Sequence, residues 1–313
     1  MITEETLMGL TNLNPLQITI NRAVLEINGS CNYTCTMCPQ SQGRDHSFLD
    51  SMDLDTFKRL LKELNPSIVN LDGSGEATML KTLPYYIEAV KDFGAKAYIF
   101  SNGLKMKGQY MKDCVNAGLD FYRFSIIGYT PDLYSKWMKS SSFYWVLDNL
   151  YNMRDYSDMC FVSSYHLILD NNNLEYEKQK YLSLIDDGNI EIWKMHNWAG
   201  SYESSRKGEI KTCGRPFSPD AVVRANGAVH PCCQVLGKDV EATLGNIHDN
   251  TFEEIWNGSL YEDLRDRHRT GNYPDYCKSC DFLISDPEVL VYSNYAKDGN
   301  MNGADFNLKE YTG

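Results

Sequence analysis

The stretch Cys31-Asn-Tyr-Thr-Cys35-Thr-Met-Cys38 places three thiols at the spacing C-x3-C-x2-C, directly after an apolar run that ends at Ile27. Thiolates are soft ligands that select zinc or iron–sulfur clusters. A structural zinc site closes with four ligands, whereas three thiolates can hold three irons of a 4Fe–4S cube and leave the fourth iron open. On spacing alone, three structural thiols and an incomplete zinc knuckle remain the alternatives.

The same spacing resembles that of the radical S-adenosylmethionine (SAM) superfamily. In that family the open iron takes the amino and carboxylate groups of SAM, and the reduced cluster cleaves SAM to a 5′-deoxyadenosyl radical. The resemblance implies a 4Fe–4S cluster on Cys31, Cys35 and Cys38, SAM as cofactor, and a flavodoxin- or ferredoxin-type protein as electron donor.

Length, charge and cysteine usage bound the remaining possibilities. The chain has 313 residues, enough for one large domain and a small one, and its net charge of −12 argues against nucleic-acid binding through a broad basic face. Met1 to Leu16 shows no signal-peptide pattern, and no stretch approaches the roughly 18 apolar residues of a membrane span. We therefore expect a cytoplasmic protein without membrane partners, whose ten cysteines bind metal rather than form disulfides.

Strand and helix patterns alternate about six times over the first 200 residues. We expect strands near 17–28, 67–71, 97–100, 121–127, 160–169 and 190–195, and helices near 54–64, 83–93, 106–117, 131–138, 143–154 and 174–185. Such alternation predicts an α/β fold with a parallel sheet and right-handed crossovers. Six units are too few for an eight-unit barrel, and the resemblance implies a partial (β/α)6 barrel. The cysteine stretch follows the first strand, at the sheet edge where ligands bind.

The pattern changes after about residue 200, which predicts a second, small domain. Residues 201–211 read as a polar linker, Asn226-Gly227 predicts a hairpin turn, and helices are expected near 252–256 and 260–268. The predicted division is a lead over 1–20, the partial barrel over 21–200, a cluster-binding domain over 201–290 and a peripheral tail over 291–313.

A second set of thiols, at Cys213, Cys232, Cys277 and Cys280, falls in this second domain. Spacing alone does not distinguish zinc from a fully ligated cluster. The order Cys213-x-x-Pro, Asn226-Gly-x-x-x-Pro-Cys232 and Cys277-x-x-Cys280 resembles the SPASM/twitch extension of radical SAM enzymes. That resemblance implies a second, auxiliary 4Fe–4S cluster. Because Cys233 adjoins Cys232, either could be the ligand; Cys232 follows proline as in the family pattern, and we assign it.

Further residues are candidates for binding SAM through the resemblance. Gly73-Ser74-Gly75-Glu76 resembles the family's Gly-Gly-Glu motif, with Ser74 in place of a glycine, and glycine permits close backbone approach. Asn102, in Ser-Asn-Gly, resembles a common Thr-Asn-Gly, although a turn capping a strand gives the same pattern. Ser125 sits where the family often contacts ribose or carboxylate. Met37 stands where many members have an aromatic near adenine.

Two residues are candidates for catalysis. His196 follows the sixth predicted strand and faces the mouth of the barrel, where it could act as a base; a solvated loop is the alternative. Cys233 could donate a hydrogen atom if it is not a cluster ligand. Tyr165 and His166 alternate on the fifth predicted strand, so only one of them points inward, and the sequence does not say which.

Four functions are compatible with these features. The layout is similar to that of 2-deoxy-scyllo-inosamine dehydrogenases, aminocyclitol-oxidising members of the superfamily, and we expect oxidation of a small polar substrate with the auxiliary cluster as electron acceptor. A peptide-modifying maturase is the first alternative, although the short lead leaves no room for a peptide-recognition domain. A radical epimerase using a cysteine thiol is the second. An electron carrier or zinc-stabilised binding protein would leave Gly73 to Glu76 unexplained.

Overall fold

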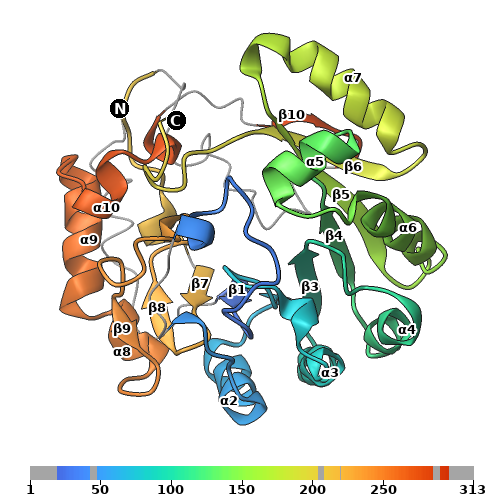
Figure 1. Cartoon of the computed structure of the whole chain (residues 1–313). Coiled ribbons are helices and arrows are strands. Elements are labelled where there is room, and N and C mark those ends of the chain that lie inside the picture. The colour runs from blue at the N-terminus through green and yellow to red at the C-terminus, as the bar shows by residue number, and fades with distance from the viewer. Residues whose placement is uncertain (1–19, 43–47, 204–207, 219, 285–289, 296–313) are drawn as a thin grey trace.

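Ten strands of the described chain form one sheet, in which the first six run parallel and in chain order (Figure 1). The structure is a computed structural model that describes residues 20–42, 48–203, 208–218, 220–284 and 290–295. The parallel strands are β1 (Arg22–Leu25), β2 (Ile68–Asn70), β3 (Lys96–Ser101), β4 (Phe121–Ser125), β5 (Phe161–Ile168) and β6 (Asn189–Lys194). The sheet order β10-β6-β5-β4-β3-β2-β1-β7-β8-β9 is open, as a six-unit partial barrel requires.

The helices between these strands confirm the predicted alternation. They are α2 (Leu54–Leu64), α3 (Leu83–Phe93), α4 (Gly108–Asn116), α5 (Pro131–Met138), α6 (Phe143–Arg154) and α7 (Leu174–Leu184). Helix α2 begins after Asp53, whose carboxylate accepts hydrogen bonds from the backbone N–H groups of Asp55 and Thr56. Its apolar residues recur at helical spacing and are buried, so its boundaries follow from local sequence.

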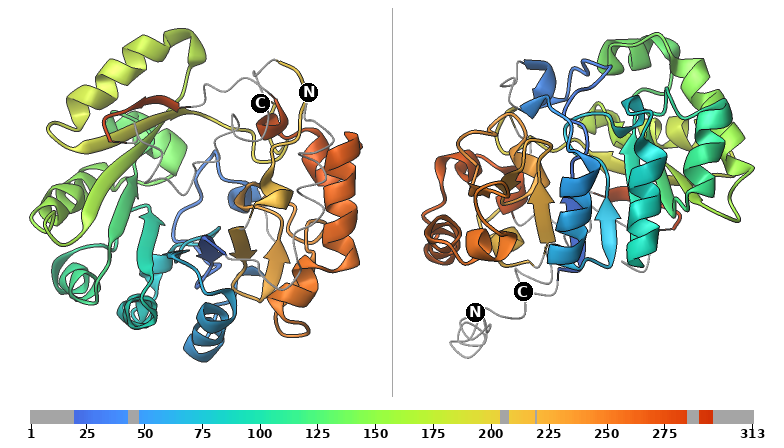
Figure 2. Two further views of the ribbon diagram at one scale, coloured as in Figure 1. Left: turned by 180° about the vertical axis from the view of Figure 1, so that it is seen from behind. Right: turned by 90° about the horizontal axis from the view of Figure 1, so that it is seen from below.

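The two faces of the parallel sheet have different neighbours, because successive residues of a strand point to opposite faces. His166 on β5 lies 4.4 Å, between ring centroids, from Tyr181 of α7, so it faces the helices. Tyr165 faces the other side, where its ring lies 4.6 Å from the guanidinium of Arg123 on β4. Figures 1 and 2 show the helices on the outer side, so Tyr165 is the inward-facing residue of the pair.

The second domain continues the same sheet. Its strands are β7 (Asp220–Val223), β8 (Ala228–His230) and β9 (Gly245–Asn246), and its helices are α8 (Phe252–Trp256), α9 (Ser259–Thr270) and α10 (Asp275–Lys278). Antiparallel pairing of β7 with β8 confirms the predicted hairpin, and Gly227 at its turn has a φ of 84° that favours glycine. Strand β7 pairs in parallel with β1, from Arg22 opposite Asp220 to Leu25 opposite Val223. The hairpin therefore lies directly beside the strand that leads into the first cysteine stretch.

Strand β10 (Leu290–Ser293) was not predicted. It pairs antiparallel with β6 and closes the far edge of the sheet, and the predicted domain boundary at residue 290 falls within it. Beyond it, the side chain of Asn294 bonds to the backbone of Ile190 and Gly188. The start of the predicted tail is thus part of the barrel, whereas residues 296–313 and most of the predicted lead lie outside the described residues.

Among the described residues, no helix is both long and apolar enough to cross a membrane.

The hydroxyl of Tyr181 joins strand β5 to the loop after β4 on the helix-facing side, and removing it tests this packing. It donates to the carbonyl oxygen of Leu167 (2.9 Å) and accepts from the backbone N–H of Gly128 (3.0 Å), fully buried. Tyr181→Phe leaves both backbone groups unpaired, and we expect it to lower the free energy of unfolding by about 1–3 kcal/mol. Tyr176→Phe, on the exposed face of the same helix, is the control. Anaerobic urea unfolding measures both; equal effects would contradict the prediction.

Candidate functional site

The first cysteine stretch lies in the loop after β1, between the barrel mouth and α5. The backbone N–H of Thr36 donates to the carbonyl oxygen of Trp137 (2.7 Å), and the Cys35 Sγ lies 3.8 Å from the Met138 sulfur. Burial raises the pKa of Cys31 to about 12, and burial together with the neighbouring thiols raises that of Cys35 further. Three close thiolates are therefore unfavourable unless a strongly positive group holds them, which is what a metal centre supplies.

The number of thiols in each set, three and four, matches what an iron–sulfur cluster can take. In the part of the chain described, no group of three or more His, Cys, Asp or Glu side chains is arranged to hold one metal ion. A single zinc binds each sulfur at about 2.3 Å and so draws its ligands to within roughly 4 Å of each other. A 4Fe–4S cube takes each thiolate on a different iron and tolerates wider separation.

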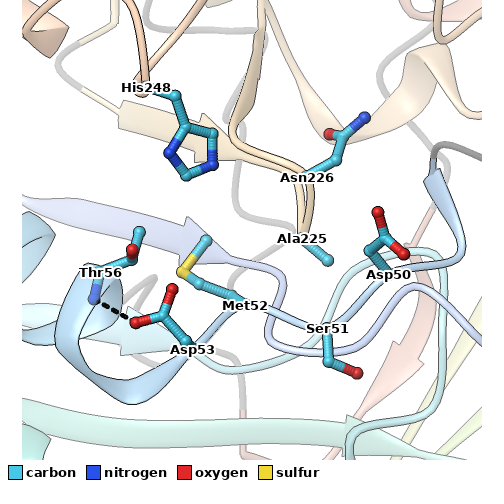
Figure 3. A pocket seen from close by; sticks show the side chains of 8 residues that line it. All are labelled: Asp50, Ser51, Met52, Asp53, Thr56, Ala225, Asn226 and His248. Carbon is cyan, nitrogen blue, oxygen red and sulfur yellow. Dashed lines mark hydrogen bonds between the residues drawn. The ribbon is translucent and has the colours of Figure 1, made fainter.

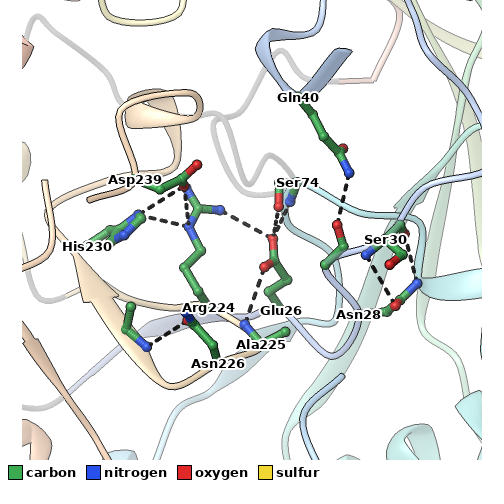
Figure 4. Close-up of polar contacts among 12 residues, drawn as sticks. Glu26, Asn28, Ser30, Gln40, Ser74, Arg224, Ala225, Asn226, His230 and Asp239 are labelled. Atoms are coloured by element: carbon green, nitrogen blue, oxygen red, sulfur yellow. Dashed lines mark hydrogen bonds and ion pairs between the residues drawn. The ribbon is translucent and has the colours of Figure 1, made fainter. Parts of the chain in front are cut away.

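The glycine-rich loop after β2 packs tightly on the cysteine loop (Figure 4). A Cβ at Gly75 would come within 2.1 Å of the carbonyl oxygen of Asn28, and one at Gly73 within 2.3 Å of the carboxylate of Glu26. Both positions therefore require glycine for close approach. Ser74 donates from both its backbone N–H and its hydroxyl to the same Glu26 carboxylate, which gives the serine a partner that a glycine would lack.

Glu26 belongs to a buried network that joins the two domains (Figure 4). Its carboxylate lies 3.5 Å from Nη1 of Arg224, and Nε of Arg224 donates to Nδ1 of His230 (2.9 Å). Both Glu26 and Arg224 are 1% exposed. Because His230 stands two residues before Cys232, this network links the glycine-rich loop to the strand that leads to the auxiliary thiols.

The side chain of Glu76 makes hydrogen bonds to two neighbouring segments of the protein. Its carboxylate accepts hydrogen bonds from the backbone and hydroxyl of Thr78, the hydroxyl of Ser101 (2.7 Å) and the backbone N–H of Asn102 (2.8 Å). Asn102 in turn donates from its amide to Asn32 in the cysteine loop (2.9 Å). Glu76 and Asn102 thus hold the glycine-rich loop against the cysteine stretch, and their contact with SAM stays a prediction.

The structure places the remaining SAM-binding candidates, Met37 and Ser125, on two different elements. Met37 is 6% exposed and packs in the core next to the cysteine stretch. Ser125 ends β4, pairs in register with Tyr165, and so belongs to the concave face of the sheet. A pocket of about 240 Å³ opens beside Cys31 and is lined by Ser30, Cys31, Tyr33, Thr34, Gln40, Ser41 and Leu49.

Sequence reasoning missed a charged group on the concave face. Arg123 on β4 forms a buried ion pair with Glu191 on β6, and its guanidinium lies 3.6 Å from the ring centroid of Phe100. Asp72, just before the glycine-rich loop, accepts hydrogen bonds from Asn70 and from the backbone of Phe100, and burial raises its pKa to about 6. Periodicity reads such strands as buried and gives no sign of which charged residues meet across them.

The second set of thiols comes together as predicted. Cys213, Cys277 and Cys280 share a small buried cluster with Phe282. Burial raises the pKa of Cys277, and the thiolates that raise it further are those of Cys232, Cys213 and Cys280; the same Cys232 and Cys213 act on Cys280. Cys232 and Cys280 also border one small apolar cluster, and the assignment of Cys232 as the fourth ligand stays a prediction.

The thiol of Cys233 has different neighbours. Its Sγ accepts from Nη1 of Arg215 (3.5 Å) and from the amide of Gln234 (3.7 Å). It is partly buried. Cys233 therefore lies beside the auxiliary thiols without joining the set that surrounds Cys277 and Cys280.

His196 lies between the barrel and the auxiliary thiols. It follows β6, its ring centroid is 5.7 Å from that of Phe282, and it is partly buried. The next residue, Asn197, donates to the carbonyl oxygen of Ser279 (2.6 Å) and exchanges two hydrogen bonds with Asp281. The loop after β6 is thus fixed onto the loop that carries Cys277 and Cys280.

A separate pocket lies outside the predicted site (Figure 3). It has a volume of about 240 Å³ and lies between the start of α2 and the β7–β8 turn. Its lining residues are Asp50, Ser51, Met52, Asp53, Thr56, Ala225, Asn226 and His248, none of which was predicted as a site residue.

Comparisons with known proteins agree with this geometry. The model of the radical SAM superfamily matches residues 25–178, and a model described as the SPASM iron–sulfur cluster-binding domain matches residues 213–281. The tungsten-containing aldehyde ferredoxin oxidoreductase cofactor-modifying protein of Pyrococcus furiosus is 23% identical over an alignment of 310 residues. The alignment covers 82% of this chain and 86% of that protein.

Two solved structures share the fold. BtrN in complex with AdoMet and 2-DOIA has a TM-score of 0.57 at 18% identity, over 88% of this chain and 98% of that chain. Streptococcus suis SuiB bound to the precursor peptide SuiA has a TM-score of 0.64 at 13% identity, over 90% of this chain and 73% of that chain.

Fold and site together define an α/β enzyme built for iron–sulfur chemistry. The chain belongs to the radical SAM superfamily, and its second domain is a SPASM domain. The cofactors implied by the resemblance are confirmed: a 4Fe–4S cluster, SAM and an auxiliary 4Fe–4S cluster. The residues that would hold the first cluster are Cys31, Cys35 and Cys38, and those for the second are Cys213, Cys232, Cys277 and Cys280.

Replacing the adjacent cysteines Cys232 and Cys233 one at a time should have different effects on the iron content. Two 4Fe–4S clusters need about eight irons per chain. Cys232→Ala should lower this to about four, because the auxiliary cluster loses a ligand, whereas Cys233→Ala should keep about eight. Iron and sulfide analysis after anaerobic reconstitution measures both. The reverse result would show that Cys233 is the ligand.

Glu26→Gln tests the network beneath the glycine-rich loop. The amide presents a donor where Ser74 and Arg224 also donate, and a mispaired buried donor costs about 1–3 kcal/mol. We expect KM for SAM to rise about tenfold in dithionite-driven 5′-deoxyadenosine formation, with a smaller change in kcat. Glu177→Gln, a buried carboxylate on α7 bonded to the backbone of Leu169, is the control and should leave KM unchanged. An equal rise in both variants would assign the effect to stability alone.

The raised pKa of Asp72 predicts that the stability of the folded protein depends on pH. Its pKa in the folded protein is about 6 against an ordinary value of 3.8, so between these values the folded state holds the extra proton. Stability of the native protein, relative to Asp72→Asn, should therefore fall as pH rises from 4 to 7. Because Asp72 is partly exposed, we expect a change of about 1 kcal/mol. Anaerobic thermal unfolding at several pH values measures the difference; a constant difference would contradict the shift.

Proposed function

We propose that this enzyme oxidises a small polar substrate, such as a carbohydrate or aminocyclitol, at a carbinol carbon. The polar concave face of the sheet carries this proposal. Asp72, Arg123 and Glu191 place charged groups beneath the SAM-binding candidates, and Ser125 and Tyr165 add hydroxyls. Hydroxyl and amino groups of a substrate can form further hydrogen bonds with such side chains, whereas an apolar substrate would add desolvation without new partners.

The oxidation needs three acceptors. The carbinol would lose a hydrogen atom to the 5′-deoxyadenosyl radical, a proton to a base and an electron to the auxiliary cluster, which gives a carbonyl product and one 5′-deoxyadenosine. The reducing electron for SAM cleavage would come from a flavodoxin- or ferredoxin-type donor.

His196 is the proposed base. Its loop is fixed by Asn197 onto the segment from Ser279 to Asp281, beside the auxiliary thiols. A base held there would lie between the barrel mouth, where substrate binds, and the site that accepts the electron. Its imidazole ring is oriented by contacts with Trp198 (4.2 Å between centroids) and Phe282.

Two other reactions use the same fold. SuiB is bound to a precursor peptide in its solved structure, so a peptide substrate is the first alternative. Epimerisation is the second, with Cys233 returning a hydrogen atom; its thiol contacts Arg215 and Gln234 outside the four-thiol set.

Isotope transfer distinguishes these reactions. A panel of sugars, aminocyclitols and nucleosides, with a peptide set in parallel, is screened for SAM-dependent turnover, and the responding substrate is then labelled. Deuterium at the oxidised carbon should appear in 5′-deoxyadenosine, the product should be lighter by two hydrogens, and no solvent hydrogen should enter that carbon. A product of unchanged mass that carries one solvent-derived hydrogen would instead establish epimerisation. Turnover of peptides alone would overturn the proposal.

A further inference from the structure

Arg215 places a positive charge against the auxiliary thiols. It lies in a short 3-10 helix (Arg215–Phe217) that begins two residues after Cys213. Its Nη1 donates to Sγ of Cys233 (3.5 Å), and its guanidinium carbon lies 5.1 Å from the ring centroid of Phe282, which packs with the auxiliary thiols. The side chain is thereby held on two sides, by a sulfur and by an aromatic ring.

Arg215 is a fixed cation, because a guanidinium stays protonated in proteins. Burial alone would lower the pKa of Arg215, but the nearby Cys233, Cys232 and Cys213 raise it above its ordinary value. In the opposite direction, Arg215 is the largest influence that lowers the pKa values of Cys213 and Cys232 against burial. By its geometry, this cation lies against Cys233, the neighbour of the assigned ligand Cys232, and against Phe282, which packs with Cys213, Cys277 and Cys280.

Two other charged side chains near this site, Lys238 and Asp281, each act on one cysteine of the four-thiol set. Lys238 lowers the pKa of Cys277 and donates to the carbonyl oxygen of Ala199 (2.6 Å). Asp281 acts in the opposite sense on Cys280. Arg215 is distinguished by its contacts, with the sulfur of Cys233 on one side and the ring of Phe282 on the other.

We propose that Arg215 raises the reduction potential of the auxiliary cluster and so adapts it to accept an electron. Reduction adds one negative charge to a centre already surrounded by thiolates. A nearby fixed cation stabilises the reduced state more than the oxidised one, and net charge and hydrogen bonding around the sulfurs are established determinants of cluster potential. The proposed electron-acceptor role rests on the proposed dehydrogenase function, but the effect on potential does not.

Arg215→Gln and Arg265→Gln make a matched pair. Arg265 is a second partly buried arginine of the same domain; it lies 4.3 Å from the ring of Trp256 and bonds to the carbonyl oxygen of Pro216, and no cysteine is among the groups that shift its pKa. Each variant is reconstituted anaerobically as the full chain with both clusters, and the midpoint potential of the auxiliary cluster is measured by potentiometric titration followed by electron paramagnetic resonance.

For Arg215→Gln we expect at least a tenfold fall in the equilibrium constant for reduction, which is a potential lower by about 59 mV for one electron. Arg265→Gln should leave the potential unchanged, and Arg215→Lys should recover part of the loss. An unchanged potential in Arg215→Gln, or an equal fall in both Gln variants, would overturn the proposal.

Iron content separates tuning from assembly. If Arg215→Gln fails to keep the auxiliary cluster, Arg215→Met, which preserves the apolar part of the side chain, replaces it in the titration. Loss of the cluster in both variants would also overturn the proposal, because Arg215 would then be needed to hold the cluster. The titration contains no substrate, so it tests the role of Arg215 alone. A lowered potential together with a failed oxidation assay would reject the proposed dehydrogenase function and leave the role of Arg215 intact.

Discussion

A buried carboxylate at the end of β1 holds the two halves of the site in one arrangement. Glu26 receives the backbone and hydroxyl of Ser74 from the barrel and the guanidinium of Arg224 from the β7–β8 hairpin. A buried charge is tolerated only when it is paired and hydrogen-bonded, so removing either partner would leave the other desolvated. The parallel pairing of β1 with β7 brings these residues together. The first cysteine stretch follows β1, and Cys232 follows the β7–β8 hairpin, so both sets of thiols depend on this pairing for their position.

Local pattern was sufficient for most of the barrel. The boundaries of α2, α3 and α6 agree with those predicted, because apolar spacing is a property of neighbouring residues; at α2 the capping residue Asp53 is local as well. The two cysteine sets were also recognised from spacing and resemblance. In each of these cases the relevant information lies within a short stretch of chain.

The features that were not predicted all depend on residues distant in sequence. The pairing of β7 with β1, the addition of β10 to β6 and the meeting of Arg123 with Glu191 join segments separated by tens to hundreds of residues. The hydrophobic periodicity of one strand does not show which other strands lie beside it. Ser74 illustrates the consequence: in the sequence it is a departure from a glycine motif, whereas in the structure its hydroxyl is half of its contact with Glu26.

The arginines of the site explain how an acidic protein accommodates this chemistry. With a net charge of −12, the chain has no shortage of negative groups, and thiolate-bound clusters add more. Arg224 faces Glu26, Arg123 faces Glu191, and Arg215 faces the auxiliary thiols. The first two cations meet carboxylates of the protein itself and so can fix geometry. Only Arg215 faces sulfurs whose charge changes during an electron transfer, which makes it the one of the three suited to influence energy as well as position.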